Sequence, residues 1–410
     1  MKILIINQHA GNHGDEAAGK GLLKGLKQKI AFNENKISII YNKNTINEIE
    51  RIEKNNEISH YPGTRLSILG KIVAMSTFIF PIKVSRYLFL LSRTLYQEYN
   101  LISEADKIIS APGGVNLGPY KDWRYLWRLY VATKLKKDVA IYSISFGPLP
   151  SNILFSKSSI YVLKNVNFFS IRDKKSQRIA DDIGLNYIPS IDTAFMGYDK
   201  PDELPKDIQN MILEDYVVVV PNELYNWGNR NQWHHNFINC NKNDVDQIYI
   251  EVINYILKKS LKVVLLPQLY GSQDDISYFK RLKKHINSDK IFIVNEVYDS
   301  DIQQTVVSKA KFLVGARYHS IIFALNNKVP FLSLSYEHKM KNTLEILGLE
   351  KNNLDLTYLL SNKNINLEAK LEELMLESEN LYKKPQSYAA HKIAQETMDK
   401  LHIFIGKDSD

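Results

Sequence analysis

The sequence has little of what would place it in an oxidising compartment or inside a membrane. It has a single cysteine, Cys240, among 410 residues. One cysteine excludes an intrachain disulfide and any zinc site built from cysteines. The apolar start at residues 3–6 is too short for the core of a signal peptide. We therefore expect a cytoplasmic protein.

A strong charge of one sign is also missing. The net charge is +8, but the 53 Lys and Arg residues are dispersed along the chain together with 45 Asp and Glu residues. The sequence has no basic stripe and no known nucleic-acid-binding module, so we expect no nucleic acid partner. The positive balance fits anionic substrates or an anionic membrane surface.

The most apolar stretch, residues 66–92, is interrupted too often to span a membrane. A spanning helix needs about 20 apolar residues without charge, whereas the longest uncharged run here is 72–82. The interruptions are Lys71, Pro81, Lys83 and Arg86. Two interpretations stay open: a buried helix pair, or an apolar surface that docks peripherally on the anionic inner face of a membrane. Burial would place four side chains inside the first domain: Phe78, Phe80, Leu88 and Leu90.

Unbroken apolar runs alternate with helical patterns twice along the chain. Runs of this kind are typical of parallel strands covered on both faces. The expected strands are 2–6, 37–41, 107–110, 139–145 and 168–171, and then 216–220, 263–266, 291–294, 312–314 and 330–334. The fold class is therefore α/β, with two Rossmann-like doubly wound domains.

A polar stretch with two prolines at 198–205 predicts the linker between these domains. We expect an N-terminal domain at 1–200 that contains the apolar insert of about 66–92, and a C-terminal domain at 206–375. Residues 376–410 are expected to hold a last helix that caps or ties the domains. Doubly wound domains bind ligands at the carboxyl ends of their strands, so we expect the site in a cleft between the two.

Unusual residues follow nearly every predicted strand. Glycines at such positions let backbone N–H groups approach a ligand closely, and arginines there can bind anions. Each feature alone is weak, but all are expected on one rim. The candidate ligand contacts are Gly113, Gly114, Asn116, Arg172, Gln268, Arg317, Tyr318 and His319.

The stretch GNHGDEAAGKG at residues 11–21 nearly matches a phosphate-binding P-loop. Gly14, Gly19 and Lys20 fit the pattern, but Gly21 stands where the magnesium-binding hydroxyl should be. Asp15 and the glutamate after it would also place two carboxylates inside an anion cradle. A different explanation is needed for this Gly-rich turn.

Read together, these motifs resemble the polysaccharide pyruvyl transferase family. The resemblance rests on short pieces spread over residues 2–349. They are Asn12-His13-Gly14-Asp15-Glu16, Pro112-Gly113-Gly114, Arg172-Asp173 with Ser176, Asp192 before Ala194-Phe195, and Gly315-Ala316-Arg317-Tyr318-His319 with Ala324, Pro330, Tyr336, Lys339 and Leu347-Gly348-Leu349. The first turn then resembles the family's N-x-G-D-E turn.

The resemblance implies a GT-B-like arrangement and transfer of pyruvate from phosphoenolpyruvate onto two sugar hydroxyls, forming a cyclic ketal. The acceptor would be a cell-surface polysaccharide or its lipid-linked precursor. Phosphoenolpyruvate has a phosphate and a carboxylate, and arginine matches both anions bidentately. Arg172 and Arg317 are therefore expected to bind it, with the other substrate contacts at Asn12, Gly14, Tyr336 and Lys339 and at the residues that follow the strands.

Protonating the methylene carbon of phosphoenolpyruvate calls for a general acid that titrates near neutrality. His319 is the candidate acid, and the base for the acceptor hydroxyl is Asp15, Glu16 or His319 itself. The scheme demands no cofactor and no metal.

Structural interpretations of the same residues stay open. His319 could be a polar core residue, Arg317 could pair with a carboxylate across the domain interface, and Asp15 could cap the first helix. A loop with four aromatic or imidazole side chains resembles a sugar platform but could equally fold on itself: Trp227, Trp233, His234 and His235.

The main functional alternative is a GT-B glycosyltransferase that uses a nucleotide sugar. It would need an acidic residue for the ribose hydroxyls, and Glu337 could serve. A non-catalytic carbohydrate-binding protein is a third class, which loss of Arg317 or His319 would have favoured.

Overall fold

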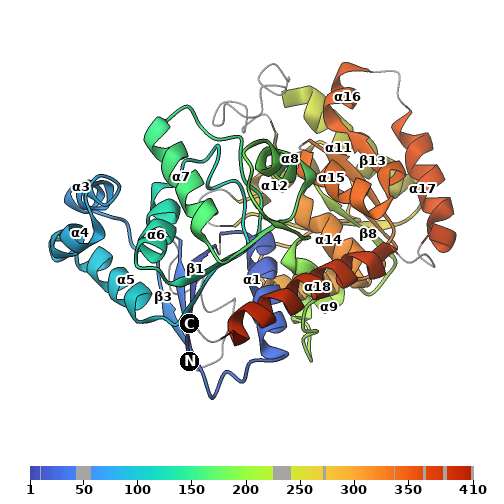
Figure 1. Ribbon diagram of the computed structural model, residues 1–410. Helices are drawn as coiled ribbons and strands as arrows, with labels where there is room; N and C mark the ends of the chain where they lie inside the picture. Colours follow the sequence, from blue (N-terminus) through green and yellow to red (C-terminus); the bar gives the residue numbers. More distant parts are fainter. Residues whose placement is uncertain are drawn as a thin grey trace. The chain divides into compact units, whose positions relative to one another are not determined.

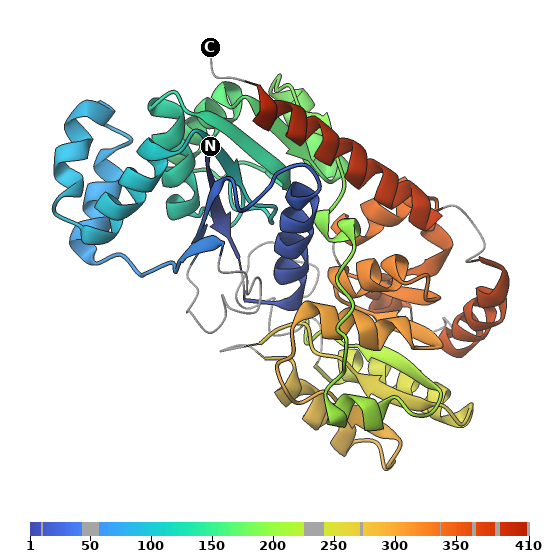
Figure 2. The same ribbon diagram turned by 90° about the horizontal axis from the view of Figure 1, so that it is seen from below.

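The computed structural model describes residues 1–9, 11–42, 57–224, 242–270, 274–336, 338–362, 366–381 and 386–407 (Figures 1 and 2). The chain divides into two compact units. The first unit comprises residues 1–11, 15–196 and 391–410, and the second comprises 12–14 and 197–390. The aromatic loop that contains Trp227, Trp233, His234 and His235 lies outside the described residues, as do Cys240 and Glu337.

The first unit is built on a seven-stranded parallel sheet with the order β3-β2-β1-β4-β5-β6-β7. Its strands are β1 (Lys2–Gln8), β2 (Lys36–Tyr41), β3 (Ile58–Tyr61), β4 (Lys107–Ser110), β5 (Asp138–Ile144), β6 (Phe168–Ile171) and β7 (Ile188–Pro189). Its helices are α1 (His13–Lys27), whose first two residues belong to the second unit, α3 (Ile68–Ser76), α4 (Ile82–Phe89), α5 (Arg93–Glu104), α6 (Trp123–Lys134), α7 (Ile153–Asn165), α8 (Lys174–Asp182) and the short η1 (Thr193–Met196).

Both faces of this sheet are covered. In β1, Leu4 and Ile6 face a core shared with α5 and α6, whereas Ile3 and Ile5 face a second core. This second core contains leucines of α1 and also Met398 and Leu401 of the last helix, α18 (Gln386–Gly406). Alternating burial on two faces explains why the strand reads as a continuous apolar run.

The second unit is built on a six-stranded parallel sheet with the order β10-β9-β8-β11-β12-β13. Its strands are β8 (Tyr216–Val220), β9 (Lys262–Leu265), β10 (Ile291–Ile293), β11 (Phe312–Gly315), β12 (Phe331–Ser335) and β13 (Asn353–Asp355). Its helices are α9 (Lys206–Met211), α11 (Lys242–Lys258), α12 (Ile276–Lys284), α13 (Ser300–Ser308), α14 (Tyr318–Asn326), α15 (His338–Leu347), the short η3 (Glu350–Asn352), α16 (Leu356–Ser361) and α17 (Leu367–Leu381).

The predicted α/β class with two parallel sheets is confirmed, and every strand expected from the sequence is present. The described chain has three further short strands that the sequence did not indicate. They are β3 and β7 at the two edges of the first sheet and β13 at one edge of the second. These edge strands are short and mostly only partly buried, so they lack the continuous apolar run of a strand that is covered on both faces.

Candidate active site

The carboxyl ends of the second unit's strands form a site at its topological switch point. Strand β8 lies between β9 and β11. After β8 the chain first adds β9 and β10 on one side, and then crosses to the other side of β8 to add β11. Open α/β sheets bind ligands at the strand ends next to such a reversal. Asn222 follows β8 at this point, Gln268 follows β9, and Arg317 follows β11.

Arg317 is held at this switch point by a buried carboxylate. It is the N-cap residue of α14, and its guanidinium donates to Oδ1 of Asp275. The other oxygen of Asp275 accepts the backbone N–H groups of Gln268, at 2.9 Å, and Leu269, at 2.8 Å. Burial disfavours the charged form of Arg317, but Asp275, helped by the Tyr336 hydroxyl, outweighs it and raises the arginine pKa. Arg317 is therefore a fixed, permanently charged group.

Two side-chain amides at the same strand ends have no hydrogen-bond partner among the residues that the structure describes. Gln268 and Asn222 are almost fully buried. Within the described parts of the chain, neither the nitrogen nor the oxygen of either amide has a hydrogen-bond partner. Leaving a buried amide unsatisfied costs about 1–3 kcal/mol, so such groups usually mark the place of a ligand or an ordered water. Gln268 was predicted as a site residue, whereas Asn222 was not.

The turn at residues 12–14 is part of this site. Asn12 forms a β-bridge with Leu269, and the backbone N–H of His13 donates to the carbonyl of Gln268 at 3.0 Å. Gly14 packs directly on His319, because a Cβ at position 14 would lie only 2.6 Å from Cε1 of the imidazole. The turn and the residues after β11 are thus built to fit each other, and glycine is needed for the approach.

This close approach gives a direct test of the site. We expect Gly14→Ala to push the imidazole of His319 out of position and to lower turnover about tenfold or more, since small misplacements of reacting groups are costly. Gly11→Ala is the matched control in the same turn, because nothing lies within 4 Å of a Cβ at that position. Equal turnover of the two variants would contradict a catalytic role for the Gly14–His319 contact. Melting temperatures should stay close to wild type in both.

Three other residues predicted for this site are held by neighbours in the second unit. The hydroxyl of Tyr318 lies 3.2 Å from that of Thr343, and its ring lies edge-on to His319 at 5.0 Å between centroids. The ammonium of Lys339 lies 5.4 Å from the centroid of the Tyr318 ring. Tyr336 lies within electrostatic range of Arg317. Tyr318 is buried, so it positions His319 rather than presenting its hydroxyl to solvent.

In the first unit, Arg172 is also paired with a buried carboxylate. Its guanidinium donates to Asp192 and, from Nε, to the hydroxyl of Ser145 at 3.1 Å. Asp173 next to it caps α8 by accepting the N–H and hydroxyl of Ser176, at 2.8 and 2.7 Å. Two motif pieces that are 20 residues apart, Arg172 and Asp192, therefore form one ion pair.

The two carboxylates predicted as bases lie in the first turn of α1, at residues three and four of the helix. Neither is the N-cap, but both lie where negative charge complements the helix dipole. The Glu16 carboxylate is fully buried and lies 3.5 Å from the ammonium of Lys20. Asp15 is half-buried, so of the two it is the more accessible to a substrate.

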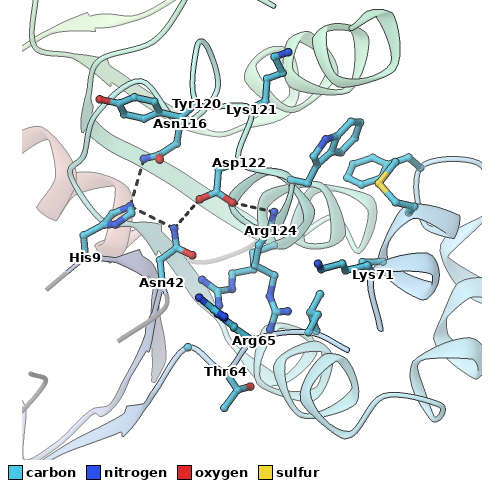
Figure 3. Close-up of a pocket in the computed structure, with 17 residues that line it drawn as sticks. His9, Asn42, Thr64, Arg65, Lys71, Asn116, Tyr120, Lys121, Asp122 and Arg124 are labelled. Carbon is cyan, nitrogen blue, oxygen red and sulfur yellow. Dashed lines mark hydrogen bonds between the residues drawn. The ribbon is translucent and has the colours of Figure 1, made fainter. Parts of the chain in front are cut away.

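A cavity of about 810 Å³ lies in the first unit, at the carboxyl ends of β1, β2 and β4 (Figure 3). His9 lines it, with Nε2 at 3.4 Å from the amide nitrogens of both Asn42 and Asn116. Asn42 also donates to Asp122 at 2.8 Å, and Asp122 caps α6. This too is a topological switch point, because β1 lies between β2 and β4.

One wall of the cavity is cationic. Arg124 and Arg128 share the buried carboxylate of Glu98, at 2.8 and 2.7 Å. Burial opposes ionisation of Glu98, but the two arginines outweigh it and lower its pKa to about 2. Arg65 and Lys71 also line the cavity, and Figure 3 shows Lys71 reaching into it from α3. Neither of these two has an ion-pair partner among the described residues.

The predicted residues thus fall into groups within the two units. Asn12, Gly14, Gln268, Arg317, His319 and Tyr336 meet in the second unit; Asn116 lines the cavity of the first, and Gly113 lies beside it, because a Cβ at 113 would contact the Asn116 amide at 3.5 Å. Gly114 lies next to Tyr120, because a Cβ at position 114 would be 3.7 Å from its ring. Sequence reasoning gave no role to Asp275 and missed Asn222, His9 and Asn42. The last three lie within two residues of a strand's carboxyl end, and this position could have indicated them from the sequence.

Solved structures show which fold class these units define. The chain aligns with a UDP-GlcNAc 2-epimerase from Methanocaldococcus jannaschii at a TM-score of 0.59 and 15% identity, covering 98% of this chain and 100% of the other. A UGT transferase from Siraitia grosvenorii aligns at 0.55 and 9% identity, covering 99% and 100%. The fold is therefore GT-B-like, with two Rossmann-like α/β domains.

Sequence comparison identifies the family within this fold. The family model for polysaccharide pyruvyl transferase matches residues 12–338. The amylovoran biosynthesis protein AmsJ of Erwinia amylovora is 23% identical over 375 residues, covering 85% of this chain and 86% of that protein. The chain belongs to the polysaccharide pyruvyl transferase family, and it is accordingly a transferase of polysaccharide biosynthesis.

Proposed function

We propose that this protein transfers pyruvate from phosphoenolpyruvate to two hydroxyls of one sugar, forming a pyruvate ketal on a polysaccharide or its precursor. The observation that supports this most directly is the fit of the turn at 12–14 onto His319, beside the fixed charge of Arg317. It brings together two of the sequence pieces that carry the family resemblance. The site offers a cation, an imidazole and two amides that have no hydrogen-bond partner among the described residues, and these groups suit the proposed reaction.

The proposed reaction begins with proton transfer from His319 to the methylene carbon of phosphoenolpyruvate. The central carbon becomes electrophilic, the oxygen of the first sugar hydroxyl bonds to it, and the C–O bond to phosphate breaks. The second hydroxyl then adds to the same carbon and closes the ketal. Of the two hydroxyl protons, one leaves on inorganic phosphate, and the other is accepted by Asp15 or His319. The accepted proton balances the one that His319 gave to the methylene carbon.

Arg317 and the two amides are proposed to bind the donor. The guanidinium of Arg317 donates to Oδ1 of Asp275, and a guanidinium has five N–H donors in a rigid fork. A planar fork of this kind suits the carboxylate or phosphate of phosphoenolpyruvate. Gln268 and Asn222 offer amide N–H groups at the same strand ends. Arg172, fixed by Asp192 in the first unit, is proposed as the second anion-binding arginine.

The cavity in the first unit is proposed to bind the acceptor. Its volume of about 810 Å³ falls in the range of small-molecule sites, about 300–1,000 Å³. Amide, imidazole and carboxylate groups line it together with the aromatic rings of Tyr120 and Trp123. Such a lining combines hydrogen bonds for sugar hydroxyls with flat apolar faces for the ring.

The identity of the donor substrate distinguishes the proposed pyruvyl transfer from glycosyl transfer, which would use a sugar nucleotide. Purified protein is incubated with phosphoenolpyruvate and candidate glycan acceptors, and inorganic phosphate is measured together with the methyl signal of the ketal by NMR. We expect phosphate release that depends on acceptor, with loss of product when one of the two acceptor hydroxyls is removed. Release of a nucleoside diphosphate from a sugar nucleotide, without use of phosphoenolpyruvate, would instead identify a glycosyltransferase.

A further inference from the structure

Helices α3 and α4 of the first unit expose a large apolar surface. Figures 1 and 2 show the pair beyond α5, on the side away from the sheet. We call this pair, from residue 68 to residue 91, the hairpin. Nine of its large apolar side chains are exposed, with Ile68 the most exposed at 79%: Ile68, Leu69, Ile72, Ile79, Phe80, Val84, Tyr87, Leu90 and Leu91. Apolar patches of this kind mark interaction sites.

The opposite side of the hairpin is firmly attached to the core. Phe78 packs against Trp123, at 5.3 Å between ring centroids, and Phe89 packs edge-on against Trp127 at 5.5 Å. The indole N–H of Trp127 donates to the hydroxyl of Thr77 at 3.1 Å. The interpretation as a buried helix pair is thus right for Phe78, right in part for Leu88, which is partly buried against the core, and wrong for Phe80 and Leu90. The exposed side chains sit on a well-packed scaffold.

The charge of this region has one sign only. From Ile58 to Gln97 the sequence has no Asp or Glu. The same stretch has five basic residues: Arg65, Lys71, Lys83, Arg86 and Arg93. Lys83 and Arg86 lie on α4 among the exposed apolar side chains. A protein partner would have to cover these cations with its own carboxylates, whereas an anionic lipid surface satisfies cations and apolar side chains together.

We propose that the hairpin docks on an anionic lipid membrane, with its apolar side chains in the interface and its basic residues at the phosphate headgroups. Helices of eight and nine residues are each about 12–14 Å long, far less than the roughly 30 Å of a bilayer core. Among the described helices, none is long and apolar enough to cross a membrane. Docking is therefore peripheral.

The hairpin and the cavity of the first unit share a helix. Lys71 of α3 lines the cavity, as does Arg65, which precedes this helix. Docking through the hairpin places this cationic wall near the lipid headgroups. If the cavity binds the acceptor as proposed above, an acceptor carried on a lipid phosphate meets cations there. This last step rests on the proposed function, whereas docking itself does not.

Vesicle flotation tests the docking without any turnover. The full-length protein is mixed with vesicles of phosphatidylcholine alone, or with vesicles that also contain roughly 30% of the anionic lipid phosphatidylglycerol, which attracts basic residues. The mixture is centrifuged through a gradient at low and high salt. We expect flotation with anionic vesicles only, weakened but not abolished by salt. Wild-type protein that stays in the soluble fraction with anionic vesicles at low salt overturns the proposal, as does equal binding to neutral vesicles.

Two sets of variants separate the apolar and basic contributions. We expect Lys83→Glu/Arg86→Glu to weaken binding at least about 30-fold, from about two lost charge contacts, and Ile72→Ser/Phe80→Ser to weaken it about tenfold or more. Ile403→Ser is the matched control, because Ile403 and Ile72 are equally exposed, at 62%, but Ile403 lies on α18. Light scattering tests whether a second copy of the chain covers the hairpin instead of lipid. A dimer that the hairpin variants dissociate, together with no lipid binding, overturns the proposal.

Discussion

His319→Gln is expected to lower turnover about 100-fold or more while phosphoenolpyruvate binding changes by only about threefold, the pattern of a lost general acid. Glutamine has similar length and keeps one hydrogen-bond donor, but it cannot give up a proton to carbon. The residue is half-buried between the Tyr318 ring and the Gly14 turn. A side chain held in this way can be replaced without moving the strand ends. The measurements are single-turnover phosphate release and calorimetric binding of phosphoenolpyruvate.

The control for this variant is His285→Gln, since His285 is an exposed residue that ends α12 in the same unit. Its turnover should match wild type. If His319→Gln instead keeps full turnover at saturating substrate and loses only binding, His319 is an anion ligand and the proton donor is another residue. Unchanged kinetics in both respects would remove His319 from the site.

The fold could be predicted from the sequence because most strands of both sheets are buried on two faces. In β5 and β8 almost every residue is buried, so the sequence shows a continuous apolar run that only a covered parallel strand explains. The edge strand β3 lacks this signal, since three of its four residues are partly or fully exposed. Its place follows from pairing with β2, which is a tertiary contact that local pattern cannot report.

The sequence could predict only those site residues that follow strand ends or belong to a recognisable motif. Arg317 and Gln268 come shortly after strands, which indicated both residues, and the family motif indicated Arg317 as well. Asp275 is equally central, but it precedes α12, seven residues beyond Gln268, and its role depends on folding back onto the strand ends. The pairing of Arg172 with Asp192 was missed for the same reason. Ion pairs between distant segments need the fold before they can be seen.

Arg317→Lys is expected to lower kcat/KM for phosphoenolpyruvate about 30-fold or more, because a lysine keeps the charge but loses the planar fork, a loss of about 2 kcal/mol or more. The alternative is that Arg317 serves only to neutralise the buried Asp275. In that case a lysine would reduce stability, since a poorly paired buried carboxylate costs about 3 kcal/mol or more, and kinetics of the folded enzyme would not change. Melting temperature and kcat/KM, measured on the same preparations, separate the two outcomes.

Two further variants complete the test of Arg317: one changes its ion-pair partner Asp275, and the other is a control. Asp275→Asn keeps the shape of the side chain but weakens its hold on the guanidinium, so a donor-binding role for Arg317 predicts a higher KM for phosphoenolpyruvate in this variant as well. Arg281→Lys is the control, because Arg281 pairs with Glu223 at 2.7 Å in the same unit but is partly exposed, where such pairs contribute about 1 kcal/mol or less. Its kinetics should match wild type. Wild-type kcat/KM in Arg317→Lys, with a lowered melting temperature, would leave Arg317 as a structural residue and assign donor binding to other groups.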